Sequence, residues 1–265
     1  MLFPENSIIF EGITSVSAVI NSIRNNKSNR QVLNIYFDET KIKKEHGRYL
    51  FLKAASSELG IPFHVVSSSD IAESAMGKTH GGILAEVTEA KYKDITPDDI
   101  ALDRFYAIIE GVEDPYSLGY SLRALYACGC EAVILPRHLH SAADSTLCKA
   151  SAGASELLNI YVADTASAAA VFKSLGYKIA CAAIPESEVC YDADLCTPLL
   201  LVIGGEKRGI SSKLMAMKDL NIRIPYGREF MGSLSTASAV SILSYEILRQ
   251  NSKIERLRNV TTKEI

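Results

Sequence analysis

The stretch Leu199-Leu-Leu-Val-Ile-Gly-Gly-Glu-Lys-Arg-Gly-Ile210 decides how the rest of the chain is interpreted. Five apolar residues run into a pair of glycines, which predicts a buried strand that ends in a tight loop. Unbroken leucine, valine and isoleucine is typical of a parallel sheet covered on both faces. Glycines past the carboxyl end of such a strand let the backbone approach a ligand, where open α/β sheets bind ligands. The glycine spacing matches neither G-x-G-x-x-G nor a P-loop, so both nucleotide-binding interpretations fail.

Two further stretches also join a strand-like run to a glycine-containing loop and a helix. Residues 221–225 form a second strand-like run, followed by a loop over 226–232 and a helix that opens within Ser233-Leu-Ser-Thr-Ala-Ser238. Earlier, Glu110-Gly-Val-Glu-Asp-Pro-Tyr-Ser-Leu-Gly-Tyr-Ser-Leu-Arg123 joins a strand to a helix that carries a single arginine. In this order, the three stretches resemble the three motifs of the SpoU-type, TrmH-like RNA ribose 2′-O-methyltransferases of the SPOUT superfamily. The resemblance covers about residues 104–250.

The resemblance implies transfer of a methyl group from S-adenosyl-L-methionine to a ribose 2′-hydroxyl of ribosomal or transfer RNA. Such an in-line displacement is mainly a positioning task for the protein, because the cofactor supplies the reactive group. The resemblance also implies a SPOUT α/β knot, a deep trefoil knot that physical reasoning from the sequence would not predict. It further implies a homodimer, because the family builds its site beside a two-fold interface.

Correspondence with the family motifs places cofactor-binding residues at the ends of two strands and the start of the last helix. These positions are Val202, Gly204, Gly209, Ile224, Leu234 and Ala239. Glycine-rich bends with apolar neighbours offer backbone donors and acceptors together with apolar walls, which is what an adenine needs.

Three residues form the predicted catalytic set: Arg123, Glu206 and Ser235. Arg123 matches the arginine that the family assigns to the target ribose. An arginine stays protonated near neutral pH, so we expect it to hold the adjacent phosphate and stabilise a developing alkoxide. Glu206 matches the acid of the second motif and would fix Arg123 or an arginine of a partner chain. The alternatives are an arginine on a helix surface and a glutamate that simply follows a turn.

The sequence departs from the family pattern at three positions. Ser117 and Ser235 stand where family members usually carry asparagine, and Gly205 is a second glycine where they more often carry Asn, Ser or Ala; Ser238 matches. Serine lacks the reach and the second donor of the amide. Two other functions therefore stay open. One is an RNA-binding paralogue that binds the cofactor but has lost methyl transfer. The other is a generic nucleotide-binding α/β enzyme.

The amino-terminal part predicts a small α/β domain over residues 1–92. Strand-like runs cover residues 7–11, 32–37, 62–66 and 82–87; a helix is expected to begin at Thr14, and another to cover 49–59 before Gly60. This part resembles, more loosely, the family's RNA-binding amino-terminal domain. One basic cluster supplies the predicted RNA-binding residues: Lys41, Lys43, Lys44 and Arg48. A solvated helix start is the alternative interpretation of this cluster.

Residues 91–103 are polar and are interpreted as a linker to a second domain over 104–265. Strands expected at 105–109, 132–135, 160–163 and 179–184 alternate with helices expected at 117–128, 142–150 and 165–175, which predicts a parallel sheet covered by helices. The last helix repeats apolar residues at Ala237, Val240, Leu243 and Ile247, and Ala239 and Ile242 widen that face. The charged tail after Gln250 is expected to fray.

Composition narrows the class of protein. The chain of 265 residues has a net charge of −3, so any contact with RNA must use a local basic patch. The six cysteines form no C-x-x-C pair and are interpreted as reduced thiols in apolar surroundings, and His138-x-His140 has no third ligand, so no metal is expected. Neither a signal peptide nor an apolar run long enough for a membrane is visible, which makes the cytoplasm the expected compartment.

Overall fold

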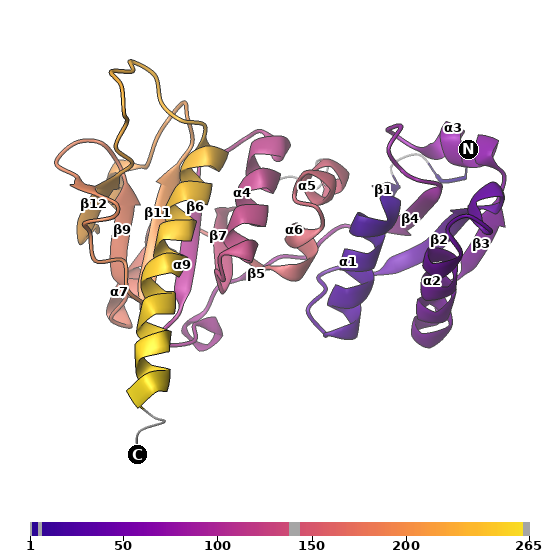
Figure 1. Cartoon of the computed structure of the whole chain (residues 1–265), viewed down its shortest axis with the longest axis horizontal. Coiled ribbons are helices and arrows are strands. Elements are labelled where there is room, and N and C mark those ends of the chain that lie inside the picture. The colour runs from indigo at the N-terminus through magenta and orange to yellow at the C-terminus, as the bar shows by residue number, and fades with distance from the viewer. Residues whose placement is uncertain (1, 5–6, 138–143, 262–265) are drawn as a thin grey trace. The chain divides into compact units, whose positions relative to one another are not determined.

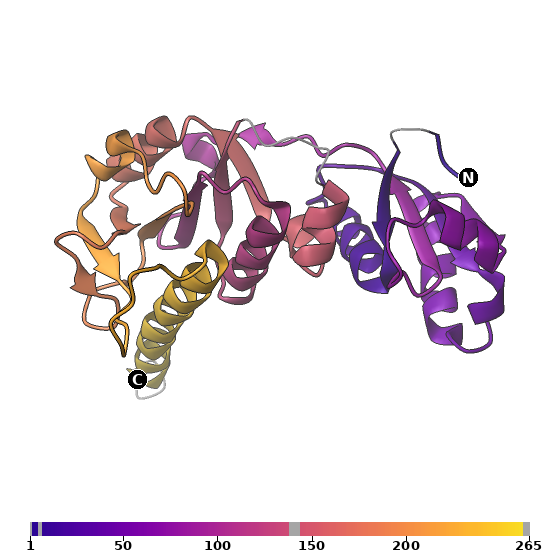
Figure 2. The ribbon, with the colours of Figure 1, turned by 90° about the horizontal axis from the view of Figure 1, so that it is seen from above.

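The computed structural model of the chain describes residues 2–4, 7–137 and 144–261, with side chains described as far as residue 252. The chain divides into two compact units, shown in Figures 1 and 2. The first unit comprises Met1–Lys91 and His140–Leu157, and the second comprises Tyr92–Leu139 and Leu158–Ile265. The chain therefore enters the second unit, returns to the first for a short segment, and then completes the second.

The first unit contains a mixed four-stranded sheet in the order β1-β4-β2-β3. Its strands are β1 (Ile8–Glu11), β2 (Val32–Asp38), β3 (Phe63–Val66) and β4 (Ile83–Val87). Strand β4 runs antiparallel to β1 and β2, whereas β2 and β3 are parallel. The helices of this part of the chain are α1 (Gly12–Arg24), η1 (Glu39–Lys41), α2 (His46–Leu59) and α3 (Ser68–Ser74).

The four predicted strands and both predicted helices of this unit are present, but the start of α1 was predicted wrongly. The helix begins at Gly12 rather than after Thr14, and its N-cap Glu11 makes no side-chain capping bond. The Glu11 carboxylate instead accepts hydrogen bonds from Lys149 at 2.9 Å and from the amide of Gly77 at 3.0 Å. Helix α2 ends at Gly60 as expected, because that residue has a left-handed φ of 67°.

Two short helices between residues 144 and 157 belong to the first unit. They are α5 (Asp144–Ala150) and α6 (Ala154–Leu157), and they contact β1 and α1. Alternation of strands and helices predicted that a helix over 142–150 would cover the parallel sheet, and the part from Asp144 onward does not. Amphipathic periodicity tells that a helix has a buried face but not which surface covers it.

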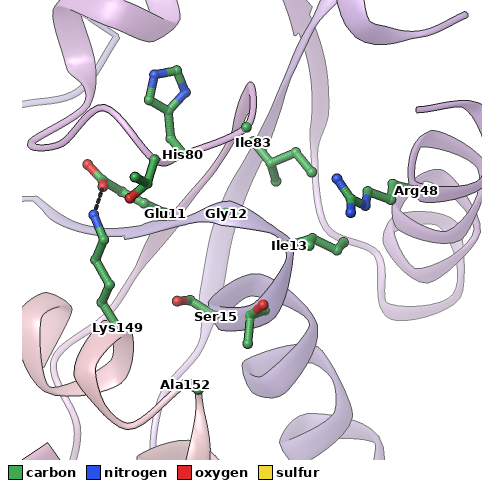
Figure 3. A pocket seen from close by; sticks show the side chains of 12 residues that line it. Glu11, Gly12, Ile13, Ser15, Arg48, His80, Ile83, Lys149 and Ala152 are labelled. Atoms are coloured by element: carbon green, nitrogen blue, oxygen red, sulfur yellow. Dashed lines mark hydrogen bonds and ion pairs between the residues drawn. The ribbon is translucent and has the colours of Figure 1, made fainter. Parts of the chain in front are cut away.

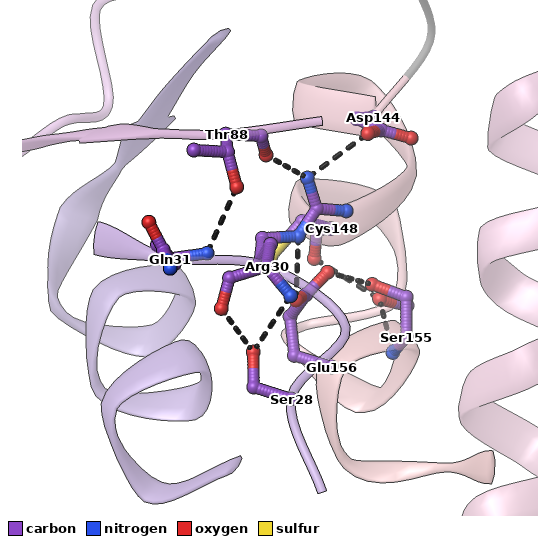
Figure 4. A network of polar contacts seen from close by, with 9 residues as sticks. Ser28, Arg30, Gln31, Thr88, Asp144, Cys148, Ser155 and Glu156 are labelled. Carbon is purple, nitrogen blue, oxygen red and sulfur yellow. Dashed lines mark hydrogen bonds and ion pairs between the residues drawn. The ribbon is translucent and has the colours of Figure 1, made fainter. Parts of the chain in front are cut away.

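A buried ionic group ties α5 and α6 to the first unit (Figure 4). Arg30 donates to Asp144 and to Glu156, each at 2.9 Å, and to the carbonyl oxygen of Thr88 at 2.9 Å. The guanidinium also lies 5.0 Å from the centre of the Phe10 ring. The side chains of Arg30, Asp144 and Glu156 are 2%, 5% and 6% exposed. Burial raises the pKa of the Glu156 carboxyl above its usual value, although Arg30 opposes that shift.

The second unit contains an eight-stranded sheet among its described residues, in the order β10-β12-β9-β11-β6-β7-β8-β5. The strands are β5 (Lys93–Asp94), β6 (Phe105–Glu110), β7 (Ala132–Pro136), β8 (Asn159–Ala163), β9 (Lys178–Ala182), β10 (Glu188–Val189), β11 (Leu199–Gly204) and β12 (Leu220–Arg223). Every pairing in this sheet is parallel, which confirms the predicted parallel α/β architecture.

Helices cover both faces of the parallel sheet, as Figure 2 shows. They are η2 (Pro97–Asp99), α4 (Pro115–Ala127), α7 (Thr165–Ser174), α8 (Ser212–Met215) and α9 (Thr236–Thr261). On the α7 side the rings of Tyr106, Phe172 and Tyr177 pack against one another, with centroids 4.9 to 5.6 Å apart. On the other side α4 lies along α9 (Figure 1), whose Val240, Leu243 and Ile247 are buried as predicted.

Three features of this unit differ from prediction. The expected linker contains β5, which pairs with β8, and β10 pairs with β12; both strands have only two residues and are too short for a periodic signal. The last helix continues to Thr261 instead of fraying after Gln250.

The six cysteines are free thiols, and burial raises the pKa of Cys181 to about 11, in keeping with their interpretation as small apolar residues.

We predict that Arg30→Met lowers the free energy of unfolding of the first unit by about 3–5 kcal/mol, because it leaves two buried carboxylates without their cation. The loss is expected to be greater at pH 8 than at pH 5. Without Arg30 the folded-state pKa of Glu156 rises further above its unfolded value, so its contribution falls as pH rises through the folded pKa. Denaturant unfolding at the two pH values measures both effects.

Arg24→Met is the matched control. Arg24 pairs with Glu58 at 2.5 Å, but the two side chains are 27% and 54% exposed. Surface pairs of this kind contribute about 1 kcal/mol or less. Equal effects of the two substitutions would contradict a structural role for the Arg30 group.

Candidate functional site

The three motif stretches meet at the carboxyl edge of the parallel sheet. Strands β6 and β11 pair in register along their length, and the last pair is Gly204 with Glu110. The loops after both strands therefore begin side by side. Strand β12 ends at the same edge, since its pairing with β9 is also parallel.

The loop after β11 folds back onto its own strand. The amide of Gly209 donates to the carbonyl of Gly205 at 2.9 Å, and a Cβ on Gly204 would lie 2.2 Å from the carbonyl carbon of Gly209. A Cβ on Gly205 would lie 2.0 Å from the carbonyl oxygen of Gly111. Both glycines are thus required for close contact between backbone segments. Gly209, with φ of +61°, is exposed and has open space around it.

Glu110 is a site residue that the sequence analysis did not single out. Its carboxylate accepts a hydrogen bond from the Thr165 hydroxyl and another from the Ser211 amide, each at 2.7 Å. It thereby joins the end of β6 to the starts of α7 and α8. The sequence marks Glu110 only as an acidic residue at the end of an apolar strand, and this pattern alone is a weak indication of a functional residue.

The start of α9 is held by side chains from two of the motifs. Ser235 accepts a hydrogen bond from the amide of Ser238 at 3.2 Å, the usual arrangement of an N-cap. Glu206 accepts from the amide of Thr236 at 3.2 Å, so the acid after β11 caps the same helix. Glu206 was expected to fix an arginine; within the chain its described partner is this helix terminus.

The region between β12 and α9 contains Ile224 and Leu234. The amide of Leu234 donates to the Tyr226 hydroxyl at 3.1 Å, which closes the loop 226–234. Ile224 and Pro225 line a mainly apolar cavity of about 500 Å³ together with residues of the β10 region and of α9: Cys190, Tyr191, Ser241, Ile242, Tyr245 and Glu246. Burial raises the pKa of the Cys190 thiol, which stays protonated at neutral pH. Gly204 and Leu234 do not line this cavity.

The remaining predicted cofactor positions differ in accessibility. Val202 is fully buried within the core cluster of the sheet, where its side chain supports the end of β11 and does not reach the edge. Ala239 is half-buried on the first turns of α9, and its amide donates to the carbonyl of Ser235 at 3.0 Å.

Arg123 lies on the exposed side of α4. That helix starts at Pro115, and Asp114 caps it by accepting from the amide of Ser117 at 2.8 Å. In the part of the chain that the structure describes, no hydrogen bond or ion pair joins Arg123 to Glu206 or Ser235. Thr236 joins the start of α9 to Glu206 and to Gly204, whereas Arg123 lies on α4, a helix that packs along α9.

The predicted RNA-binding residues lie around η1 and the start of α2 in the first unit. Lys43, Lys44 and Arg48 are exposed, and Lys41 is half-buried. Arg48 also lines a cavity of about 270 Å³ at the start of α1, shown in Figure 3, which includes Glu11, His80 and Lys149. Arg48 is paired with Glu45 at 3.0 Å.

Neither a metal site nor a membrane span is found in the described part of the chain. No group of three potential ligands is close enough to hold a metal ion there, and His138 and His140 lie outside the described residues. No described helix combines the length and the apolar character needed to cross a membrane.

Comparison with known proteins identifies relatives over most of the chain. The model of the SpoU rRNA Methylase family matches residues 104–245. The 23S rRNA (guanosine-2′-O-)-methyltransferase RlmB of Escherichia coli is 30% identical over 214 residues, which is 79% of this chain and 88% of that protein. RlmB of Photobacterium profundum is 28% identical over 212 residues, 78% of this chain and 86% of that protein.

Solved structures share the fold. An AdoMet-bound rRNA methyltransferase from Sinorhizobium meliloti superposes with a TM-score of 0.74 at 19% identity, over 92% of this chain and 87% of the other. The SpoU methyltransferase AviRb from Streptomyces viridochromogenes gives 0.71 at 18% identity, over 94% of each chain. Since the family model spans more than half of the sequence and includes all three motif stretches, the chain belongs to the SpoU rRNA methylase family.

Proposed function

We propose that the protein is an S-adenosyl-L-methionine-dependent RNA methyltransferase that modifies a ribose 2′-hydroxyl of ribosomal or transfer RNA. The observation that carries the proposal is the family match over residues 104–245, which contain the three loops gathered at one edge of the sheet. Relatives whose names state 23S rRNA guanosine 2′-O-methylation support the reaction and the substrate class.

The residues at this edge suit the cofactor. The loop 204–210 offers backbone groups around the exposed Gly209, and the end of β12 contributes the apolar Ile224 and Pro225 beside a cavity large enough for a nucleoside. When bound, the cofactor supplies an activated methyl group. Gly204, Gly209, Ile224, Leu234 and Ala239 would hold it, with Val202 behind them.

The chain's own contribution is to orient the ribose and to stabilise negative charge. Arg123 is exposed, permanently charged and free to bind a phosphate beside the target ribose. Ser235 accepts a hydrogen bond as the cap of α9, so it can contact substrate only through the donor or acceptor capacity that its hydroxyl does not share with Ser238. Glu206 fixes the helix start and acts as a positioning residue.

The first unit would bind the RNA substrate. Its exposed Lys43, Lys44 and Arg48 form a local basic patch on a chain of net charge −3. Under this proposal the first unit acts as the RNA-binding domain and the second unit as the methyltransferase domain. Action on ribosomal or transfer RNA in turn favours the cytoplasm.

We also propose a knotted chain and a homodimer. The hydrogen bonds from Thr236 to Glu206 and to the carbonyl of Gly204 favour a path in which the start of α9 passes the loop after β11, as a trefoil knot requires. On the outer side of α4 and α9, Tyr120, Ile242 and Tyr245 are 51%, 41% and 63% exposed. A second copy would bury these side chains.

A non-catalytic, cofactor-binding paralogue is the second candidate. It is favoured by one observation on Ser235, which replaces the family's asparagine. The Ser235 hydroxyl already accepts a hydrogen bond from the amide of Ser238 and forms another with the Ser238 hydroxyl at 2.9 Å.

We predict that S-adenosylmethionine or its demethylated product raises the Tm of the second unit. At a hundredfold excess over Kd the added free energy of unfolding is about 2.7 kcal/mol. Leu234→Asp should reduce the shift, whereas Leu102→Asp, at a site 69% exposed before β6 at the opposite edge, should not. Absence of any shift in the wild type, measured by scanning calorimetry, would contradict cofactor binding.

Arg123→Ala is expected to lower the rate of methyl transfer to ribosomal RNA by about 10²–10³, because a preorganised charged donor is lost. Cofactor affinity should stay unchanged, since other loops hold the cofactor. Tritium transfer from labelled cofactor measures the rate, and calorimetry measures the affinity.

Full activity of Arg123→Ala would show that the catalytic assignment is wrong. If the wild type and Ser235→Asn both bind cofactor and both fail to methylate ribosomal and transfer RNA, the paralogue becomes the better function.

Light scattering at micromolar concentration is expected to give the mass of a dimer. Tyr245→Arg should shift it towards the monomer, because a charge would replace a ring in the apolar face of α9. Leu50→Arg on α2, where Leu50 is 50% exposed in the first unit, serves as the control and should stay dimeric. A monomeric wild type would refute the homodimer.

A further inference from the structure

The loop of residues 226–232 presents exposed apolar side chains at the carboxyl edge of the sheet. Tyr226 and Phe230 are 40% and 61% exposed, and Met231 is fully exposed. The loop lies between β12 and α9, directly before Leu234 and Ser235. Exposed apolar clusters on a soluble domain mark surfaces that bind a ligand or a partner.

The ring of Phe230 is held in position by its neighbours. Its far end lies against Gly232, where a Cβ would be only 2.6 Å from Cζ. The Tyr226 ring lies beside it, with centroids 6.0 Å apart and planes at 55°. Tyr226 is fixed in turn by the hydrogen bond that its hydroxyl accepts from the amide of Leu234. A supported ring with much of its surface open can accept a flat partner.

Exposed cationic side chains lie on this loop and on the loop after β11. Arg228 is exposed on the same loop, and Lys207 is exposed on the loop after β11. The loop after β11 is joined to the start of α9, which follows the loop 226–232, where Glu206 accepts from the amide of Thr236. Among the described residues neither Arg228 nor Lys207 has an ion-pair partner, whereas Glu206 is engaged at α9. An aromatic platform beside unpaired cations is the combination that binds single-stranded nucleic acid.

We propose that Phe230 stacks on an unpaired base of the RNA substrate beside the ribose that is methylated. This inference rests on the proposed function and adds a specificity-determining residue to it. Arg228 and Lys207 contact the adjacent phosphates, and Tyr226 is a positioning residue for the ring. Since duplex bases are already stacked, the platform selects single-stranded target sites.

The absence of tryptophan from the sequence allows a direct test. Phe230→Trp places the single tryptophan of the chain at the platform, where it can be excited selectively over tyrosine, and a short single-stranded oligoadenylate is the probe. We expect saturable quenching of its fluorescence, at least fivefold weaker binding of a duplex RNA, and no such quenching in Leu102→Trp. Equal quenching in both variants, or none in Phe230→Trp, would overturn the proposal.

Kinetics provide the second measurement. Phe230→Ala should lower kcat/KM on ribosomal RNA by about 5- to 150-fold, the range for loss of one stacked base. Phe230→Tyr should stay near the wild type and Phe230→Leu should resemble Phe230→Ala, because stacking needs a ring. Wild-type activity of Phe230→Leu, or dissociation of the dimer by Phe230→Ala, would instead identify a subunit contact and refute stacking.

The two measurements separate this inference from the proposed function. The fluorescence titration needs neither cofactor nor turnover. A protein that binds the cofactor and methylates RNA but shows no quenching contradicts the role of Phe230 alone. Quenching without methyl transfer contradicts the enzymatic activity and leaves the platform in place.

Discussion

The site depends on the contact between two strand ends that have no side chains between them. The amide of Gly205 donates to the carbonyl of Glu110 at 2.6 Å, and the space that a Cβ on Gly205 would need is occupied by the Gly111 carbonyl. This approach turns the loop after β11 back on itself. Glu206 then lies where it accepts a hydrogen bond from the amide of Thr236 at the start of α9. The Glu110 carboxylate accepts from the Ser211 amide before α8 and from the Thr165 hydroxyl at the start of α7. One backbone contact therefore sets the geometry of several loops.

A second constraint shapes the first unit. Arg30 and its partner Asp144 are 114 residues apart in sequence, yet the pair is buried with Glu156. Separating these groups would leave charge in an apolar surrounding, which costs several kcal/mol. The segment 144–157, which connects β7 to β8, therefore packs in the first unit even though both strands lie in the second.

Sequence patterns predicted the strands of the first sheet and the longer strands of the second, and also that the second sheet is parallel, because unbroken apolar runs and regular alternation are strong signals. They failed where a contact is made by residues distant in sequence. The periodicity of residues 144–150 is the same whichever surface they cover, so their place is decided by long-range contacts such as those of Asp144 with Arg30 and of Lys149 with Glu11. The sequence marked the glycines after β11 but could not show that Gly204 and Gly205 pack against the backbone of Gly209 and Gly111. Glu110 was missed because its two hydrogen-bond donors follow it at long range.

The central claim is that the loops after β11 and β12 and the start of α9 form one cofactor site. Hydrogen–deuterium exchange with and without S-adenosylhomocysteine tests it most directly. The account predicts slower exchange confined to residues 203–211 and 224–239, with the first unit unchanged. Protection centred elsewhere, such as the cavity at the start of α1, or no protection at saturating ligand, would contradict it.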